Sequence, residues 1–228
     1  MLFPLKLYDF FRRYLFSSSY ILIICANLLV AQDVAAEQIT DSAGKDPVIL
    51  VLGDSLSGAY GIDSDRGWVS LLQQRLDSEG YGYRVINASV SGDTTRTGLS
   101  RIDVALSAHH PAIAIIALGG NDGLRGLPFT EIENSLANII ELSRDSGTKV
   151  LLVGVRLPPN YGSAYIDKFT AIYTSLAERY NTALVPRVLE GVAEHPELMQ
   201  QDGIHPTAEA QPKVMKNIWQ GLQPMLKP

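Results

Sequence analysis

The stretch that indicates the fold is residues 48–61, VILVLGDSLSGAYG, in which five apolar residues are followed at once by glycine and small polar residues. A continuous apolar run of this length is typical of a strand in a parallel sheet that helices cover on both faces. A Gly-rich turn after such a strand can cradle a phosphate or present a nucleophile. The run therefore predicts the fold class, and the turn raises the question of function.

The alternation of strand and helix patterns continues to the end of the chain. The strands are expected at 48–52, 83–88, 112–118, 150–155 and 182–185, and the helices at 68–78, 95–108, 129–146, 165–180 and 208–226. In the clearest helix, Ile132, Leu136 and Ile139 recur at helical spacing. This order predicts right-handed crossovers and a doubly wound, three-layer α/β/α sandwich around a five-stranded parallel sheet.

Residues 1–36 differ in character from the rest. Basic residues precede an apolar run at 20–30, and small residues occupy positions 34 and 36. This pattern predicts a secretory signal peptide that is cut after Ala36, and hence a periplasmic or secreted protein. The alternative is an uncleaved membrane anchor, although the run is shorter than the roughly 20 residues that a membrane-spanning helix needs.

Composition excludes several classes of function. The single cysteine, Cys25, lies within this leader, so the mature domain has no thiol for a disulfide, for catalysis or for a metal. The 19 basic and 24 acidic side chains give a net charge of −5, and no cluster of Lys or Arg indicates a nucleic-acid partner.

Candidate functional residues follow the predicted strands, because doubly wound proteins bind ligands at the carboxyl ends of their strands. Four such loops, and a fifth segment just before the last helix, carry glycine and polar residues: GDS at 53–55, SGDT at 91–94, GGND at 119–122, RLPPNYG at 156–162 and DGIHP at 202–206. In a sheet of this kind these segments converge on one edge.

The first loop does not suit a phosphate. Gly53 and Gly58 have the spacing of a P-loop, but Ala59 and Tyr60 stand where lysine and serine or threonine are required. The dinucleotide pattern GxGxxG is absent after this strand as well. The nucleophile interpretation is therefore favoured.

A serine nucleophile needs a base, and a histidine base needs a carboxylate to orient it. Ser55 supplies the hydroxyl, while Asp202 and His205 lie three residues apart in a loop bounded by glycine and proline. The other histidines precede a strand at the wrong edge of the sheet or lie in a polar segment: His109, His110 and His195.

Each of these residues taken alone has a structural explanation. Ser55 could cap a helix, Asn121 could occupy a turn with positive φ, Asp202 could form an Asx-turn, and His205 could be a surface histidine. Their joint occurrence at the predicted site favours catalysis.

The blocks GDSL, the glycine of SGDT, GGND and DGIHP, in this order, resemble the conserved blocks of the SGNH (GDSL) hydrolases over nearly all of the mature chain. The longer strings LGGNDGLRG, RLPPNYG and QDGIHPTAEAQP are similar to the bacterial group of multifunctional thioesterase, protease, lysophospholipase and arylesterase enzymes. The resemblance implies a flavodoxin-like fold for a single domain at 37–228.

The resemblance also implies the roles of the site residues. Ser55 is expected to be the nucleophile, His205 the base and Asp202 its orienting carboxylate. The N–H groups of Ser55 and Gly92 and the side-chain amide of Asn121 are expected to form the oxyanion hole. These types suit the chemistry, since a tetrahedral oxyanion is stabilised by preorganised neutral donors.

Two further expectations concern the neighbourhood of the nucleophile. Asp54 is expected to hydrogen-bond neighbouring loops, and residues 123–128 to form a mobile lip over an acyl groove. The residues expected to line this groove are Leu124, Leu157, Pro158 and Tyr161.

We therefore expect a monomeric serine esterase that acts through an acyl-enzyme on lysophospholipid, acyl-CoA-type and aryl esters, without metal, cofactor or nucleic acid. A carbohydrate O-acetyl esterase is the alternative within the same family. A non-catalytic binding module would not need the complete set of four site residues, and a dedicated protease is disfavoured because peptide bonds are harder to cleave than activated esters.

Overall fold

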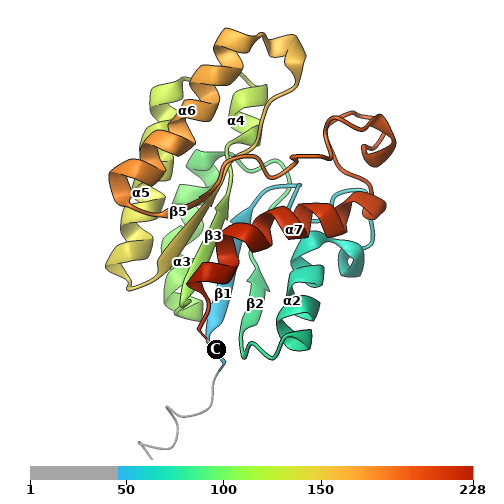
Figure 1. The fold of residues 1–228 in the computed structure, drawn as a ribbon. Helices are drawn as coiled ribbons and strands as arrows, with labels where there is room; N and C mark the ends of the chain where they lie inside the picture. Colours follow the sequence, from blue (N-terminus) through green and yellow to red (C-terminus); the bar gives the residue numbers. More distant parts are fainter. Residues whose placement is uncertain (1–45, 228) are drawn as a thin grey trace, which may run out of the picture. The chain divides into compact units, whose positions relative to one another are not determined.

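Five parallel strands form one sheet in the order β2-β1-β3-β4-β5 (Figure 1). The computed structural model describes residues 46–227, so the predicted signal peptide and Cys25 lie outside the described residues. The strands are β1 (Val48–Gly53), β2 (Arg84–Asn87), β3 (Ile113–Ala117), β4 (Lys149–Val153) and β5 (Ala183–Val185). This order is that of flavodoxin-like proteins, so the predicted fold class is confirmed.

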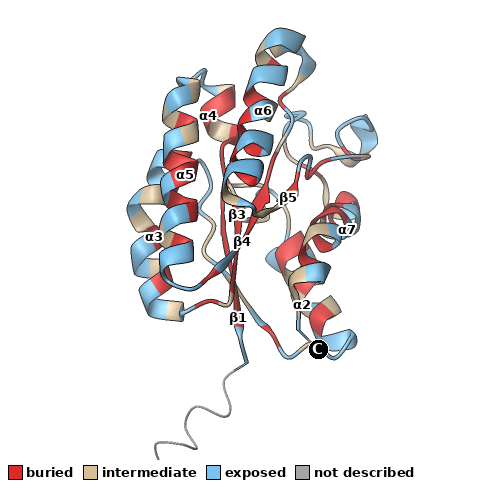
Figure 2. Ribbon diagram, turned by 60° about the vertical axis from the view of Figure 1, so that its left-hand side comes forward, coloured by how far each residue is buried: buried red, intermediate tan, exposed pale blue. Residues whose placement is uncertain are grey.

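Helices cover both faces of the sheet (Figures 1 and 2). One face packs against α3 (Thr95–His109), α5 (Phe129–Asp145) and α6 (Ser163–Tyr180), and the other against α2 (Trp68–Ser78) and α7 (Gln211–Leu222). A further short helix is α4 (Gly120–Leu124). None of the helices within residues 46–227 is long and apolar enough to span a bilayer.

The apolar run that opens the domain supplies both core layers. Ile49 and Val51 pack beneath α2 and α7, whereas Leu50 and Leu52 pack beneath α3, α5 and α6. All four side chains are 0% exposed. Successive side chains of a strand point to opposite faces, so a strand covered on both faces must be apolar throughout.

The predicted strands and helices agree with the structure to within two residues at each boundary, apart from two larger differences. The expected helix at 208–226 is α7 with a short 3₁₀ turn at each end, Ala208–Ala210 and Gln223–Met225. The helix α4 occupies a segment that was expected to be a loop and part of the lip. With five residues it is too short to show helical periodicity.

Candidate active site

Ser55 lies in a sharp turn at the carboxyl end of β1. The carbonyl of Asp54 accepts hydrogen bonds from the N–H groups of Ser57 (3.2 Å) and Gly58 (2.9 Å), which reverses the chain directly after the strand. A side chain at Gly53 would place its Cβ 2.5 Å from Ser57 Oγ, so this position needs glycine. Ser55 caps no helix, because the next one begins only at Ser64.

A hydrogen-bonded chain joins Ser55 to His205 and Asp202. The distance from Ser55 Oγ to His205 Nε2 is 2.8 Å, and the distance from His205 Nδ1 to Asp202 Oδ2 is 2.6 Å. The other carboxylate oxygen of Asp202 accepts hydrogen bonds from the N–H groups of Ile204 (2.9 Å) and His205 (3.0 Å). The structure thus brings together the three residues that the sequence predicted, in the order of a serine–histidine–aspartate triad.

The electrostatics of Asp202 suit an orienting carboxylate. Partial burial raises its pKa, but the hydrogen bonds from the His205 backbone, the imidazole and Ile204 outweigh burial and lower the pKa to about 2. The carboxylate is therefore ionised and keeps a proton on His205 Nδ1. This tautomer leaves the lone pair of Nε2 free to accept the proton of Ser55.

The loop that carries His205 is braced against the turn after β1. Met199 and Pro206 form an isolated antiparallel bridge, and Gln200 Nε2 donates to the carbonyl of Tyr60 (2.8 Å). The ring of Tyr60 lies on the imidazole, with 4.4 Å between the centroids. Sequence analysis did not predict this contact, since nothing local links Tyr60 to a loop about 140 residues away.

The three predicted oxyanion donors follow strands that are neighbours in the sheet. Ser55 follows β1, Gly92 follows β2, and Asn121 is the second residue of α4, which follows β3. Between residues 46 and 227, the N–H groups of Ser55 and Gly92 donate to no protein acceptor. Both are therefore available to an incoming oxyanion, although their role there stays a prediction.

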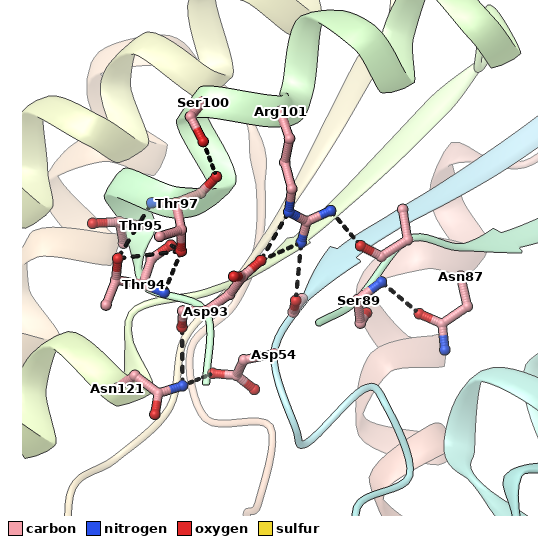
Figure 3. A network of polar contacts seen from close by, with 12 residues as sticks. Asp54, Asn87, Ser89, Asp93, Thr94, Thr95, Thr97, Ser100, Arg101 and Asn121 are labelled. Carbon is pink, nitrogen blue, oxygen red and sulfur yellow. Dashed lines mark hydrogen bonds and ion pairs between the residues drawn. The ribbon is translucent and has the colours of Figure 1, made fainter. Parts of the chain in front are cut away.

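The side chain of Asn121 is held by its neighbours (Figure 3). Its Nδ2 donates to the carbonyl of Asp93 (2.9 Å) and lies 3.3 Å from the carboxylate of Asp54. Asp54 also accepts a hydrogen bond from the N–H of Leu56 (3.0 Å), so it joins two neighbouring loops as expected. Burial raises the pKa of Asp54 to about 6, although the hydrogen bond from Leu56 and the nearby His205 both lower it.

A second buried carboxylate, Asp122, ties α4 to the start of α3. It is 0% exposed and accepts hydrogen bonds from the backbone N–H (2.9 Å) and the hydroxyl (2.6 Å) of Thr95. An anion at the N-terminus of a helix is also favoured by the helix dipole. Asp122 therefore fixes the position of Asn121, the residue that precedes it.

An open cavity of about 430 Å³ lies beside Ser55 and His205. One wall comes from α4 and the loop after β4, and it includes the predicted residues Leu124, Leu157 and Pro158. Tyr161 is not among the lining residues; its hydroxyl donates to the carbonyl of Leu124 (2.8 Å) and so supports this wall from behind. The cavity continues the site as a largely apolar groove.

The opposite wall of the cavity was missed by sequence analysis. It comes from the segment after β5 and includes Leu189, Ala193, Met199 and Ile204, with Arg187, Glu190 and Glu194 among its polar residues. Ile204 belongs to the DGIHP block, but the segment that supplies most of this wall, residues 187–198, contains no motif, and its only regular structure is one 3₁₀ turn, Pro196–Leu198. Nothing in its composition therefore distinguishes it from an ordinary surface loop.

The remaining histidines lie away from this site, as predicted. His109 ends α3 and His110 follows it, at the amino end of β3, and the exposed His195 lies 3.3 Å from Glu197. Within the part of the chain that the structure describes, no group of three or more His, Cys, Asp or Glu side chains is placed to hold a metal ion.

The sequence of this chain is similar to those of known proteins. Residues 51–211 match the model of the GDSL-like lipase/acylhydrolase family. The esterase TesA of Pseudomonas aeruginosa is 48% identical over 199 residues, which cover 87% of this chain and 98% of the relative. The thioesterase 1/protease 1/lysophospholipase L1 of Escherichia coli K12 is 39% identical over 188 residues, 82% of this chain and 89% of the relative.

A solved structure is similar over the same region. The psychrotrophic esterase EstA from Pseudoalteromonas, in a form inhibited by monoethylphosphonate, superposes with a TM-score of 0.75 at 37% sequence identity. The match covers 78% of this chain and 98% of that one. Fold, motif order and similarity thus agree.

Proposed function

Because this chain belongs to the GDSL-like lipase/acylhydrolase family and is a serine esterase, we propose that Ser55, His205 and Asp202 form its catalytic triad and hydrolyse acyl esters and thioesters. The observation that supports this most strongly is the continuous chain of contacts from Ser55 Oγ to His205 Nε2 (2.8 Å) and from His205 Nδ1 to Asp202 (2.6 Å). Its members come from opposite ends of the domain, so the arrangement depends on the whole fold.

In the first half of the proposed reaction, His205 Nε2 takes the proton of Ser55 while Ser55 Oγ attacks the carbonyl carbon of the substrate. Asp202 stabilises the imidazolium that forms. Collapse of the tetrahedral intermediate transfers the proton from His205 to the leaving alcohol or thiol, and the acyl group remains on Ser55. In the second half, His205 deprotonates a water molecule, which attacks the carbonyl carbon of the acyl-enzyme. Collapse of this second tetrahedral intermediate breaks the bond to Ser55 Oγ, which takes the proton back from His205 as the acid leaves.

The oxyanion is proposed to bind to the N–H groups of Ser55 and Gly92 and to the amide of Asn121. The first two are free donors that follow neighbouring strands. The amide of Asn121 has two N–H groups: one donates to the carbonyl of Asp93 (2.9 Å), and the other, whose contact with Asp54 is longer (3.3 Å), is the one that would turn to the oxyanion. Donors that are fixed before the reaction need no reorganisation when negative charge develops, which is why such groups lower the barrier.

The apolar cavity supports an acyl chain of some length rather than acetate alone. Half of its 20 lining residues are leucine, isoleucine, valine, alanine, proline or methionine, and they lie beside the nucleophile. We therefore propose lysophospholipids, acyl-thioesters and aryl esters as the substrate class, and export of the domain on the basis of the leader pattern at 1–36.

A substrate panel tests this function. The mature protein is assayed on p-nitrophenyl esters from acetate to palmitate, on a lysophospholipid, on an acyl-thioester and on an acetylated xylooligosaccharide, with Ser55→Ala as the blank. We expect hydrolysis of medium- or long-chain substrates that Ser55→Ala abolishes. A sharp preference for acetate on sugars would instead support a carbohydrate esterase, and equal activity of Ser55→Ala would remove the proposed mechanism.

A further inference from the structure

We infer that Arg101 is a positioning residue for the oxyanion hole, because its guanidinium joins the loops after β1 and β2, which carry the two proposed backbone donors, and Asp93 of the second loop in turn holds the amide of Asn121. This inference rests on the proposed function. Arg101 lies in the second turn of α3 and belongs to none of the sequence motifs. Its side chain extends toward the ends of β1 and β2 (Figure 3).

The contacts of the guanidinium use all three of its nitrogen atoms. Nη1 donates to the carbonyl of Ala88, and Nη2 lies 3.4 Å from the carbonyl of Gly53. Nε and Nη2 lie 2.8 Å and 2.6 Å from one carboxylate oxygen of Asp93. The side chains of Arg101 and Asp93 are only 27% and 12% exposed, so this ion pair is better shielded than the surface pairs of the protein.

Each residue that Arg101 contacts lies within four residues of a proposed backbone donor in the sequence. Gly53 precedes Ser55 by two residues, and Ala88 begins the loop that leads to Gly92. Asp93 follows Gly92 directly, and its backbone carbonyl accepts the hydrogen bond from Asn121 Nδ2 (2.9 Å). One rigid group therefore fixes the spacing between the two backbone donors and, through Asp93, the orientation of the amide.

This task suits arginine in particular. A planar guanidinium has five N–H donors in a fixed fork and can contact several acceptors from different directions at once, whereas the ammonium of lysine is a compact point charge. The two carbonyls belong to strand ends and the carboxylate to a loop. A lysine at this position could pair with Asp93 but could not hold all three groups.

The chain offers a matched control on the same helix. Arg96 forms an ion pair with Glu131 (2.7 Å) that joins α3 to α5, and its side chain is 70% exposed. Removing this pair breaks a salt bridge of α3 but leaves the contacts of Arg101 to the loops after β1 and β2 in place. Arg96→Met therefore measures what the loss of an α3 arginine does through the helix alone.

The test compares Arg101→Lys, Arg101→Met and Arg96→Met by steady-state kinetics on a p-nitrophenyl ester, with the folded fraction measured by circular dichroism. A displacement of catalytic groups on the order of 1 Å costs about 100-fold in rate. We expect kcat per folded molecule to fall about 10- to 100-fold in Arg101→Met, by less in Arg101→Lys, and by less than about 2-fold in Arg96→Met. KM should change little.

A trifluoromethyl ketone inhibitor separates positioning from folding, because it forms a tetrahedral oxyanion on the serine. Its inhibition constant should rise in parallel with the loss of kcat/KM in both Arg101 variants. Unchanged kcat and unchanged inhibition per folded molecule in both variants would overturn the inference. If wild-type protein itself hydrolysed no ester, the proposed function would fail instead, so the two failures are distinguishable.

Discussion

The substitution Asp202→Asn separates the electrostatic role of this residue from its structural one. The amide that replaces the carboxylate can keep its oxygen on the N–H groups of Ile204 and His205, which lie 2.9 and 3.0 Å from the carboxylate oxygen now present. The NH₂ group of that amide then takes the place of Asp202 Oδ2, which lies 2.6 Å from His205 Nδ1, and so it faces this nitrogen. The opposite orientation of the amide would bring the NH₂ group against two N–H donors and is disfavoured.

In that arrangement His205 must carry its proton on Nε2. The nitrogen that faces Ser55 then donates instead of accepting, so the imidazole cannot take the serine proton. Loss of the correct tautomer in a serine triad costs about 10⁴-fold in kcat, or about 5.4 kcal/mol at 1.36 kcal/mol for each factor of ten. Since both backbone hydrogen bonds remain, the thermal midpoint should stay close to that of the wild type.

The assay measures kcat on a p-nitrophenyl ester for Asp202→Asn and the wild type, together with the thermal unfolding of both. An Asp202→Asn variant that kept more than about a tenth of the wild-type kcat would refute this account of the triad. A loss of activity that merely followed a loss of folded protein would refute it too.

Three further predictions concern residues around the triad. Asn121→Ala should lower kcat about 10²- to 10³-fold, since it removes one proposed oxyanion donor, and an unchanged kcat would exclude that role. Gly92→Ala forces a side chain into a backbone with φ of +86° and should lower both kcat and the free energy of unfolding, the latter by about 1–2 kcal/mol. Gly80→Ala, with φ of +77° and no atom within 4 Å of the new Cβ, is its control: it should lose similar stability and keep kcat, and equal losses of kcat would contradict the role of Gly92. Burial raises the pKa of Asp54 from 3.8 to about 6, so the folded protein binds this proton more tightly than the unfolded chain. The resulting stabilisation is complete below about pH 4 and is lost as the pH rises through 6, at most about 3 kcal/mol. Asp54→Asn does not titrate, so its stability relative to the wild type should increase between pH 4 and pH 7, as chemical denaturation at both pH values can measure; a constant difference would contradict the assignment.

The fold could be predicted from local patterns because its strands are buried on both faces. The run at 48–52 is apolar at every position since β1 contributes to both core layers, and such a run is visible without any knowledge of contacts. The short helix α4 could not be predicted, because its five residues are shorter than two helical turns and its sequence, GNDGL, has two glycines.

The triad could be predicted because each member lies in a recognisable short motif. Ser55 follows a buried strand, and Asp202 and His205 share one loop. The residues that support the site could not be predicted in this way. Arg101 lies within an ordinary amphipathic helix, and Tyr60 contacts His205 only because two distant loops meet. Their roles depend on the tertiary structure, which no local pattern encodes.

The most direct test of the central claim is the site at which a fluorophosphonate modifies the mature protein. The reagent reacts with a serine that a neighbouring base activates, and the modified peptide can be identified by mass spectrometry. We expect one adduct, on Ser55, that is absent from Ser55→Ala and strongly reduced in Asp202→Asn. An adduct at any other residue, or ester hydrolysis that persists in Ser55→Ala, would contradict it.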